Sequence, residues 1–352
     1  MKKQKILLIN KSLVIGGIET ILATQYNSLK ENGHTVDIFL FKNIIETHIK
    51  DKTHIFFKNN NSSLSTFIQS KEMERKYDLI ICHAQSERIC KEVKSLKKAS
   101  TIFVIHGMQS KKLIHGNFIA RYLRKKRKKL LYKNQSLITV SEAVKKDIES
   151  MNIKAKIIKV IYNPFDIKHI KNLSLSLIEE KFHKPYVIWV GRISDVKNLP
   201  LLLKIYKNLS TQYDLVIVGN GNEAIKNDLL KMIENWKLKE NVHFVGFKSN
   251  PYPYIHQASA LLITSKNEGL PTVIIESLLL NTPVFGVDIP AIKELLFNYY
   301  QVGLLSGDSE EMSKQILKNI HNLIDIEKIT KELSFNISNK HYLDYFIQTQ
   351  QQ

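Results

Sequence analysis

The chain has 352 residues, of which 43% are hydrophobic and 24% charged, with a formal net charge of +19, as is typical of a soluble globular protein of two-domain length. No apolar run approaches the roughly 20 residues of a membrane-spanning helix, and the run after the basic N-terminus, Ile6–Ile9, is too short for a secretory signal peptide. Cys82 and Cys90 fit neither a C-x-x-C pair nor a metal cluster, so we expect a cytoplasmic protein without a disulfide framework.

The excess of positive over negative charge is confined to the first half of the chain. Residues 1–171 hold 34 Lys and Arg against 14 Asp and Glu, whereas residues 172–352 hold 18 against 19. This asymmetry predicts a polyanion or an anionic membrane surface as a partner of the first half. Lysine-rich codon usage is the alternative explanation, but it does not account for an excess that stops midway along the chain.

The first predicted elements form a strand–helix–strand unit. A continuous apolar run predicts a buried strand at residues 5–10, followed by a helix at about 18–31 and a second strand at 34–42. Gly16 and Gly17 precede the helix, where glycine lets the backbone approach a ligand and the helix N-terminus favours an anion. The spacing is not G-x-G-x-x-G, so these glycines are not a dinucleotide fingerprint.

The alternation of strands and helices continues through the first half. His106 ends a predicted strand at 101–105 and is followed by Gly107, so it is a candidate for either a catalytic or a structural role. The other elements expected in this half are strands at 54–58, 78–82, 136–140 and 156–162, and helices at 87–98 and 141–150, the last with Ser141 as its N-cap.

A basic run at Arg121–Lys133 is predicted to form an amphipathic helix. If it is helical, Ile119, Leu123 and Leu130 line one face, with cations around them. Such a helix lies on anionic lipid headgroups. Two alternatives are a domain helix that docks its narrow apolar stripe on the protein, and a nucleic-acid-binding segment. Against nucleic acid, aromatic residues are sparse and no known binding motif is present.

The second half repeats the alternation after a polar linker at 165–184. Because strands alternate with helices and no two-residue hairpin joins two strands, each half predicts a parallel sheet. The elements expected here are strands at 186–190, 214–218, 241–245, 260–264 and 282–287, helices at about 199–209, 222–236, 291–296 and 310–324, and a further helix that begins at 271.

Two loops of the second half carry the chemistry. Glu268 lies in the loop after the strand at 260–264, and Glu276 lies about a turn and a half into a helix that we expect to begin at Pro271. Arg192 and Lys197 share the loop after the strand at 186–190, where an Arg fork and a Lys charge could neutralise a diphosphate. Ligands of open α/β sheets bind at this edge, so the set suits a nucleotide-sugar. The alternative is that these residues have no function: Glu268 would be solvated, Glu276 would lie on a helix surface, and the two cations would be ordinary surface residues.

A catalytic metal is not expected. The sequence has no D-x-D triplet at a strand end and no His, Cys and Asp cluster at metal-ligand spacing. Arg192 and Lys197 would then supply the electrostatic stabilisation that a metal ion supplies elsewhere.

Several motifs together resemble the retaining family 4 glycosyltransferases with the GT-B fold. The resemblance spans nearly the whole chain. It is carried by E-G-L-P-T-V-I-I-E at 268–276 (the Glu-x₇-Glu motif), G-R-I-S-D-V-K-N at 191–198, the Gly16-Gly17 loop, His106-Gly107, V-S-E-A-V at 140–144 and Asn163-Pro164.

The resemblance implies an α/β fold of two tandem Rossmann-like parallel-sheet domains that face across a cleft. The domains are expected at 1–171, on the acceptor side, and at 172–327, on the nucleotide-sugar side. A C-terminal helix within 328–352, with 328–347 as the candidate, is expected to cross back to the first domain.

The resemblance also implies roles for individual residues. Arg192 and Lys197 would bind the donor diphosphate, Glu276 the ribose, and Glu268 the donor sugar, with His106 beside that sugar. Backbone groups of Gly16 and Gly17 would approach the phosphates or the acceptor. The remaining donor-site positions would be Gly219, Gly246 and Phe247 around the base, and Leu270 of the E-G-L-P motif.

The expected activity is retaining transfer of a hexose or N-acetylhexosamine from a UDP-sugar to a lipid-linked, lipopolysaccharide or capsule glycan acceptor, without a metal. The protein would be peripheral on the inner face of a bacterial cytoplasmic membrane, bound through Arg121–Lys133, with no nucleic acid as partner. Asn163-Pro164 and Asp288-Ile289-Pro290 depart from the usual glycine-containing turns and bear on the acceptor or sugar. A UDP-sugar epimerase of the same fold and a basic nucleic-acid-binding protein are the alternative functions.

Overall fold

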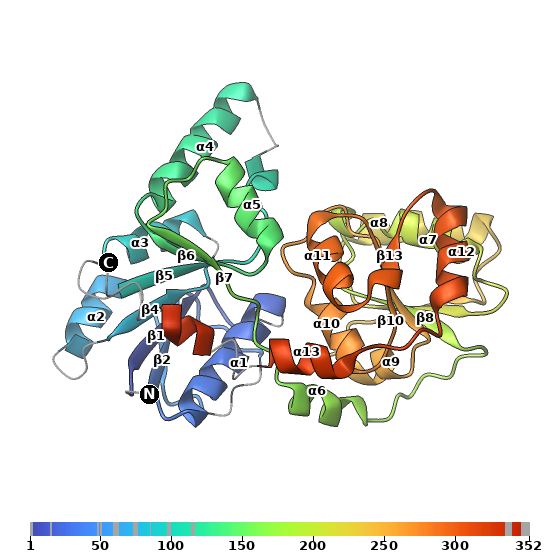
Figure 1. The fold of residues 1–352 in the computed structure, drawn as a ribbon, viewed down its shortest axis with the longest axis horizontal. Helices are drawn as coiled ribbons and strands as arrows, with labels where there is room; N and C mark the ends of the chain where they lie inside the picture. The colour runs from blue at the N-terminus through green and yellow to red at the C-terminus, as the bar shows by residue number, and fades with distance from the viewer. Residues whose placement is uncertain are drawn as a thin grey trace. The chain divides into compact units, whose positions relative to one another are not determined.

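The computed structural model describes residues 3–14, 16–47, 49, 51–58, 63–72, 77–84, 86–96, 100–113, 117–334 and 340–345. The chain forms two compact units, Met1–Phe165 with Leu333–Gln352, and Asp166–Glu332. Each unit is a parallel sheet with helices packed around it (Figure 1). The predicted fold class, two Rossmann-like parallel-sheet domains, is thus confirmed.

The sheet of the first unit has seven strands in the order β3-β2-β1-β4-β5-β6-β7, all parallel. Its central strands are continuous apolar runs because helices cover both faces of such a sheet. Ile6 to Ile9 of the first strand are fully buried. The strands are β1 (Lys5–Asn10), β2 (Thr35–Leu40), β3 (Ile55–Phe57), β4 (Leu79–Cys82), β5 (Ser100–Ile105), β6 (Ser136–Thr139) and β7 (Ile157–Val160).

The helices of this unit largely follow the sequence signals. Ser141 caps its helix as predicted, since its side chain accepts a hydrogen bond from the backbone N–H of Val144. One helix, α2, was not predicted, because its segment has no clear helical period. The helices are α1 (Gly17–Glu31), α2 (Leu64–Glu72), α3 (Glu87–Lys94), α4 (Phe118–Tyr132) and α5 (Glu142–Ser150), with a 3₁₀ turn η1 at Lys111–Leu113.

The sheet of the second unit has six strands in the order β10-β9-β8-β11-β12-β13, again all parallel. Its strands are β8 (Tyr186–Val190), β9 (Asp214–Val218), β10 (Val242–Gly246), β11 (Ala260–Ile263), β12 (Val284–Val287) and β13 (Leu304–Leu305). The two-residue β13 was not predicted, because it is too short to show any periodicity.

The helices of the second unit are α6 (Ile167–Ser174), α7 (Leu199–Lys207), α8 (Glu223–Asn235), α9 (Tyr252–His256), α10 (Thr272–Leu279), α11 (Pro290–Tyr299), α12 (Ser309–Asn319) and α13 (Ile326–Leu333), with 3₁₀ turns η2 at Asp195–Lys197 and η3 at Gln301–Gly303. Several helix boundaries differ from expectation, among them the end of α11 at Tyr299 rather than at 296. Pro271 precedes α10 as its N-cap rather than opening it, and α12 ends at Asn319 rather than near 324. The expected linker segment contains α6.

The C-terminal segment returns to the first unit. Residues 340–345 are helical, and the Tyr345 hydroxyl donates hydrogen bonds to the carbonyl oxygens of Leu137 and Ile157, at 3.2 and 3.3 Å. This confirms the predicted crossing. The expected single helix at 328–347 includes 335–339 and 346–347, which lie outside the described residues.

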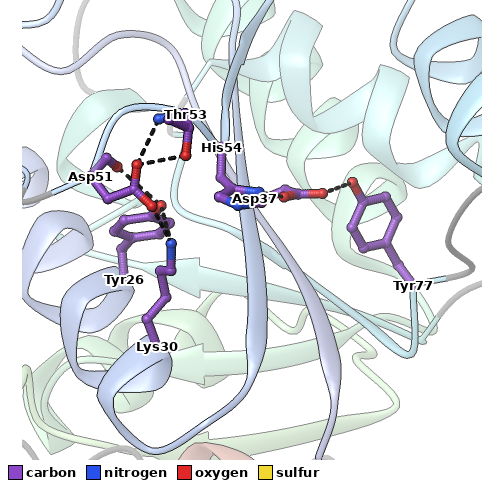
Figure 2. A network of polar contacts seen from close by, with 7 residues as sticks. All are labelled: Tyr26, Lys30, Asp37, Asp51, Thr53, His54 and Tyr77. Carbon is purple, nitrogen blue, oxygen red and sulfur yellow. Dashed lines mark hydrogen bonds and ion pairs between the residues drawn. The ribbon is translucent and has the colours of Figure 1, made fainter.

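A polar network ties β2 and α1 of the first unit to the segments around them (Figure 2). Buried Asp37 in β2 accepts a hydrogen bond from the Tyr77 hydroxyl at 2.5 Å and lies 2.9 Å from Nδ1 of His54. Beside it, Lys30 donates to Asp51 at 2.5 Å and holds the pKa of that carboxyl well below its usual range. Buried polar groups are tolerated when they are paired in this way.

Both sheets reverse their strand order beside their first strand, between β1 and β4 in one unit and between β8 and β11 in the other. In open α/β sheets the loops at the carboxyl ends of such strands form the ligand site. Seven predicted site residues lie on or after these loops, namely Gly16, Gly17, Arg192, Lys197, Glu268, Leu270 and Glu276. The other four, His106, Gly219, Gly246 and Phe247, lie at or after the carboxyl ends of β5, β9 and β10.

Candidate functional site

The loops that follow β8 and β11 interlock at the edge of the second sheet. Nζ of Lys197 lies 2.6 Å from Oε1 of Glu268. The Thr264 hydroxyl donates hydrogen bonds to the carbonyl oxygens of Lys197 and Asn198, each at 3.1 Å. The backbone N–H of Lys266 donates to the carbonyl of Val196 at 2.8 Å. Backbone and side-chain hydrogen bonds, together with the ion pair, therefore fix the two predicted loops against each other.

The cations of this edge differ in their surroundings. The Lys197 and Glu268 side chains are 24% and 14% exposed, so their ion pair is partly shielded from water. Arg192 is exposed and, among the residues that the structure describes, has no ion-pair partner. This edge therefore offers one exposed guanidinium, that of Arg192, and one ammonium that is already paired, that of Lys197.

Gly219 and Gly246 bring two further loops against this edge. The N–H of Gly219 donates to the carbonyl of Gly246 at 2.7 Å, and the N–H of Gly191 donates to Val218 at 3.0 Å. A Cβ on Gly219 would lie 1.8 Å from the carbonyl oxygen of Gly191. Glycine is therefore required there for the close approach of two backbones, whatever else the loop binds. Phe247 follows Gly246 and is half exposed.

Glu276 is not a solvated helix-surface carboxylate. It is only partly exposed, and burial raises the pKa of its carboxyl to about 7. The charge of Glu276 in turn helps to raise the pKa of Tyr252 in α9, after the larger effect of burial, so these side chains are close. Leu270, in the loop before α10, is buried. A carboxyl that is costly to keep ionised is typical of a binding or catalytic position.

The predicted residues of the first unit lie at the carboxyl edge of its own sheet. Gly16 and Gly17 stand at the start of α1, and a Cβ on Gly17 would meet nothing within 4 Å. His106 follows β5, and its Nε2 lies 2.9 Å from Nδ1 of His83. Nε2 of His83 lies 2.8 Å from Oε1 of Gln25.

His83, which contacts His106 directly, and Gln25, which contacts it through His83, were not predicted from the sequence. A signal for His83 was present, because it directly follows the buried strand β4 just as His106 follows β5. Gln25 is an internal residue of α1, where nothing in the local sequence distinguishes it from a solvent-exposed glutamine.

The basic helix α4 turns its apolar stripe away from the protein. Ile119, Leu123 and Leu130 are 66%, 46% and 57% exposed, and Phe118 and Tyr122 beside them are 79% and 59% exposed. Leu131 and Tyr132, on the opposite side of the helix, are buried. The alternative of a docked stripe is therefore wrong.

The described residues hold no group of three or more His, Cys, Asp or Glu side chains placed to bind a metal ion. None of their helices combines the length and apolar character that crossing a bilayer requires.

Comparison with known proteins identifies the family. The model described as Glycosyltransferase Family 4 matches residues 15–169, and the one described as Glycosyl transferases group 1 matches residues 177–336. The chain is 30% identical over 184 residues to the Campylobacter jejuni N-acetylgalactosamine-N,N'-diacetylbacillosaminyl-diphospho-undecaprenol 4-alpha-N-acetylgalactosaminyltransferase, covering 52% of this chain and 49% of that protein. It is 32% identical over 195 residues to the Salmonella typhimurium O-antigen chain mannosyltransferase RfbU, covering 54% and 52%.

The matches thus span about half the length of these curated relatives. The fold is similar to that of Anabaena Alr3699/HepE, solved in complex with UDP, with a TM-score of 0.77 at 19% identity over 97% of this chain and 98% of that one. Since the two family models cover most of both units, and the fold agrees, the chain belongs to the family 4 glycosyltransferases with the GT-B fold.

Proposed function

We propose that the chain moves a hexose or N-acetylhexosamine from a UDP-sugar to a lipid-linked, lipopolysaccharide or capsule glycan, with retention of anomeric configuration. The observation that carries the proposal is the interlocked pair of loops at the β8/β11 switch point, which joins Lys197 to Glu268 beside an open Arg192. The names of similar proteins support the substrate class, since they include a transferase acting on a diphospho-undecaprenol glycan, an O-antigen mannosyltransferase and a UDP complex.

In this proposal the second unit binds the donor. Arg192 and Lys197 hold the diphosphate, Glu276 accepts hydrogen bonds from the ribose hydroxyls, and Glu268 contacts the donor sugar. Gly219, Gly246 and Phe247 flank the base, and Leu270 is buried in the same loop as Glu268. His106 contacts the donor sugar, and Gly16 and Gly17 offer backbone N–H groups to phosphate or acceptor.

The proposed transfer is a front-face displacement. The bond between the anomeric carbon and the phosphate oxygen breaks as the acceptor oxygen bonds to that carbon on the same face. The departing phosphate oxygen takes the proton of the acceptor hydroxyl. Arg192 and Lys197 compensate the charge that develops on the diphosphate, so the step needs no metal ion.

A thermal-shift screen with nucleotide-sugars tests the donor site. The best donor should raise the melting temperature of the protein, and this shift should be lost in Arg192→Ala and Glu276→Ala. Lys314→Ala is the matched control, because it removes an exposed cation of the same unit that pairs with Glu310. An unchanged shift in both site variants contradicts the assignment. The anomeric coupling constant of the product, measured by NMR, decides between retention and inversion.

We further propose that α4 binds an anionic membrane surface, at the inner face of the cytoplasmic membrane where lipid-linked acceptors would lie. Solvent-facing Ile119, Leu123 and Leu130 can enter the interface, while the exposed cations Arg121, Lys126 and Arg127 meet lipid headgroups. The stripe is too narrow for deep insertion, so binding should weaken as salt is added.

Co-sedimentation with vesicles containing phosphatidylglycerol tests this surface. The wild-type protein should sediment at low salt, and a double change of Ile119 and Leu123 to Glu should abolish sedimentation. Leu177→Glu is the matched control, since Leu177 is 95% exposed in the second unit. Failure of the wild-type protein to sediment, or equal loss in the control, overturns the proposal.

A further inference from the structure

Hydrogen bonds link the side chains of Gln25, His83 and His106. Gln25 in α1 and His83 after β4 are both fully buried. Oε1 of Gln25 lies 2.8 Å from Nε2 of His83, and Nδ1 of His83 lies 2.9 Å from Nε2 of His106. The two imidazole rings are 5.1 Å apart between centroids, with planes inclined by 29°.

The chemistry of these atoms determines which of them donates and which accepts in each hydrogen bond. An amide oxygen can only accept, so Nε2 of His83 carries a hydrogen. Burial lowers the pKa of His83 to about 3, so the ring is neutral near pH 7 and its Nδ1 has a lone pair. That lone pair accepts from Nε2–H of His106. A neutral His106 therefore carries its hydrogen on Nε2 and its lone pair on Nδ1.

We infer that Gln25 and His83 are positioning residues that fix the tautomer of His106, so that its Nδ1 accepts a hydrogen bond from a hydroxyl of the donor sugar. The inference rests on the proposed function, which places His106 beside that sugar. Neither Gln25 nor His83 needs to touch the substrate.

The burial of Gln25 supports a role beyond packing. Among the described residues, the amide nitrogen of Gln25 has no hydrogen-bond partner. This fully buried residue forms a side-chain hydrogen bond between its amide oxygen and His83. A buried polar group with an unpaired donor is costly, and an apolar side chain would avoid that cost. What an apolar side chain could not supply is an acceptor for His83.

Gln25→Met should exchange the donor and acceptor roles in the hydrogen bond between His83 and His106. Met matches Gln in length but offers no strong acceptor, so Nε2–H of His83 would be left buried and unpaired. The cheaper arrangement puts the hydrogen of His83 on Nδ1, where it donates to Nε2 of His106. His106 then carries its own hydrogen on Nδ1 and cannot accept from a sugar hydroxyl there.

Nitrogen-15 NMR of the histidine rings in the full-length protein reads these tautomers directly and needs no substrate. In the wild-type protein His106 should be the Nε2–H form, and in Gln25→Met it should shift to the Nδ1–H form. His83→Asn is the conservative variant, because its amide oxygen can accept from His106 as Nδ1 of His83 does. A wild-type His106 in the Nδ1–H form, or one that Gln25→Met leaves unchanged, overturns the inference.

Kinetics then separates positioning from structural damage. With a UDP-sugar, kcat/KM should fall about tenfold in Gln25→Met, which is the effect of one lost hydrogen bond. The conservative variant His83→Asn should keep most of the wild-type kcat/KM. Affinity for UDP, which lacks the donor sugar, should not change. An equal loss of UDP affinity contradicts a positioning role. Absence of transfer with every nucleotide-sugar would sink the proposed function while leaving the NMR result valid.

Discussion

Nζ of Lys197 lies 2.6 Å from Oε1 of Glu268, so the cation assigned to the donor diphosphate is paired with the carboxylate assigned to the donor sugar. The residues are 71 positions apart in sequence and meet through the loops after β8 and β11. A diphosphate that reaches Lys197 must share the ammonium group with Glu268 or displace it. If Lys197 binds the diphosphate as proposed, this ion pair would compete with the leaving group for the ammonium.

Removing the charge of Glu268 should strengthen binding of the free diphosphate. We expect Glu268→Gln to bind UDP about three- to tenfold more tightly, as Lys197 is released from a partly shielded ion pair of about 1 kcal/mol. Lys197→Met should weaken binding by a similar factor. Titration calorimetry with UDP measures both. Asp195→Asn is the control, since it removes an exposed partner of Lys266. Weaker UDP binding in Glu268→Gln would argue against the competition.

Glu276 should make the protein less stable as pH rises. Its pKa is about 7 in the folded protein against an ordinary value of 4.5, so the folded state holds more protons than the unfolded state between these values. Stability is therefore lost across this window and stays lower above it. At pH 8, Glu276→Gln should be more stable than the wild type by about 1–2 kcal/mol, allowing for solvent screening.

Thermal melts from pH 4.5 to pH 8.5 test this sign. The wild-type and Glu276→Gln proteins should melt at similar temperatures at the acid end and separate as pH rises. Glu234→Gln, which changes an exposed carboxyl on α8, should follow the wild type throughout. A wild-type protein that gains stability over Glu276→Gln with rising pH would refute the buried-carboxyl assignment.

Donor affinity should rise with pH through the same group. Ribose hydroxyls donate to an ionised carboxylate, so binding near pH 6 requires Glu276 to lose a proton. With a pKa of about 7, affinity for a UDP-sugar should increase about tenfold from pH 6 to pH 8. Glu276→Gln should bind weakly and with a flat pH profile. Calorimetry at constant ionic strength is the measurement, and a flat wild-type profile would disprove the ribose role.

Two glycines should respond differently to the same substitution. Gly219→Ala would place a Cβ 1.8 Å from the Gly191 carbonyl oxygen, in a backbone conformation at φ +135 that suits glycine, and should cost more than about 2 kcal/mol. Gly17→Ala meets nothing within 4 Å and should change stability by less than about 1 kcal/mol. Urea unfolding measures both. A stable Gly17→Ala protein that loses activity would support a ligand role for that position.

Local patterns in the sequence were sufficient to predict many of the strands, a helix cap and the position of several site residues. Continuous apolar runs such as residues 6–9 predict buried parallel strands, because such strands are covered on both faces. Ser141 at a helix start is a local signal, since its cap bond spans three residues. The same logic placed Arg192 and Glu268 after strands, hence at the ligand edge of a sheet.

Tertiary structure decided what these residues do to one another. The bond between Lys197 and Glu268, the raised pKa of Glu276 and the contact between His83 and His106 depend on which loops and helices meet, and periodicity does not report this. The apolar stripe of α4 was visible in the sequence, but its direction was not. A stripe records only that apolar side chains share a face, and the neighbouring elements determine whether that face is covered.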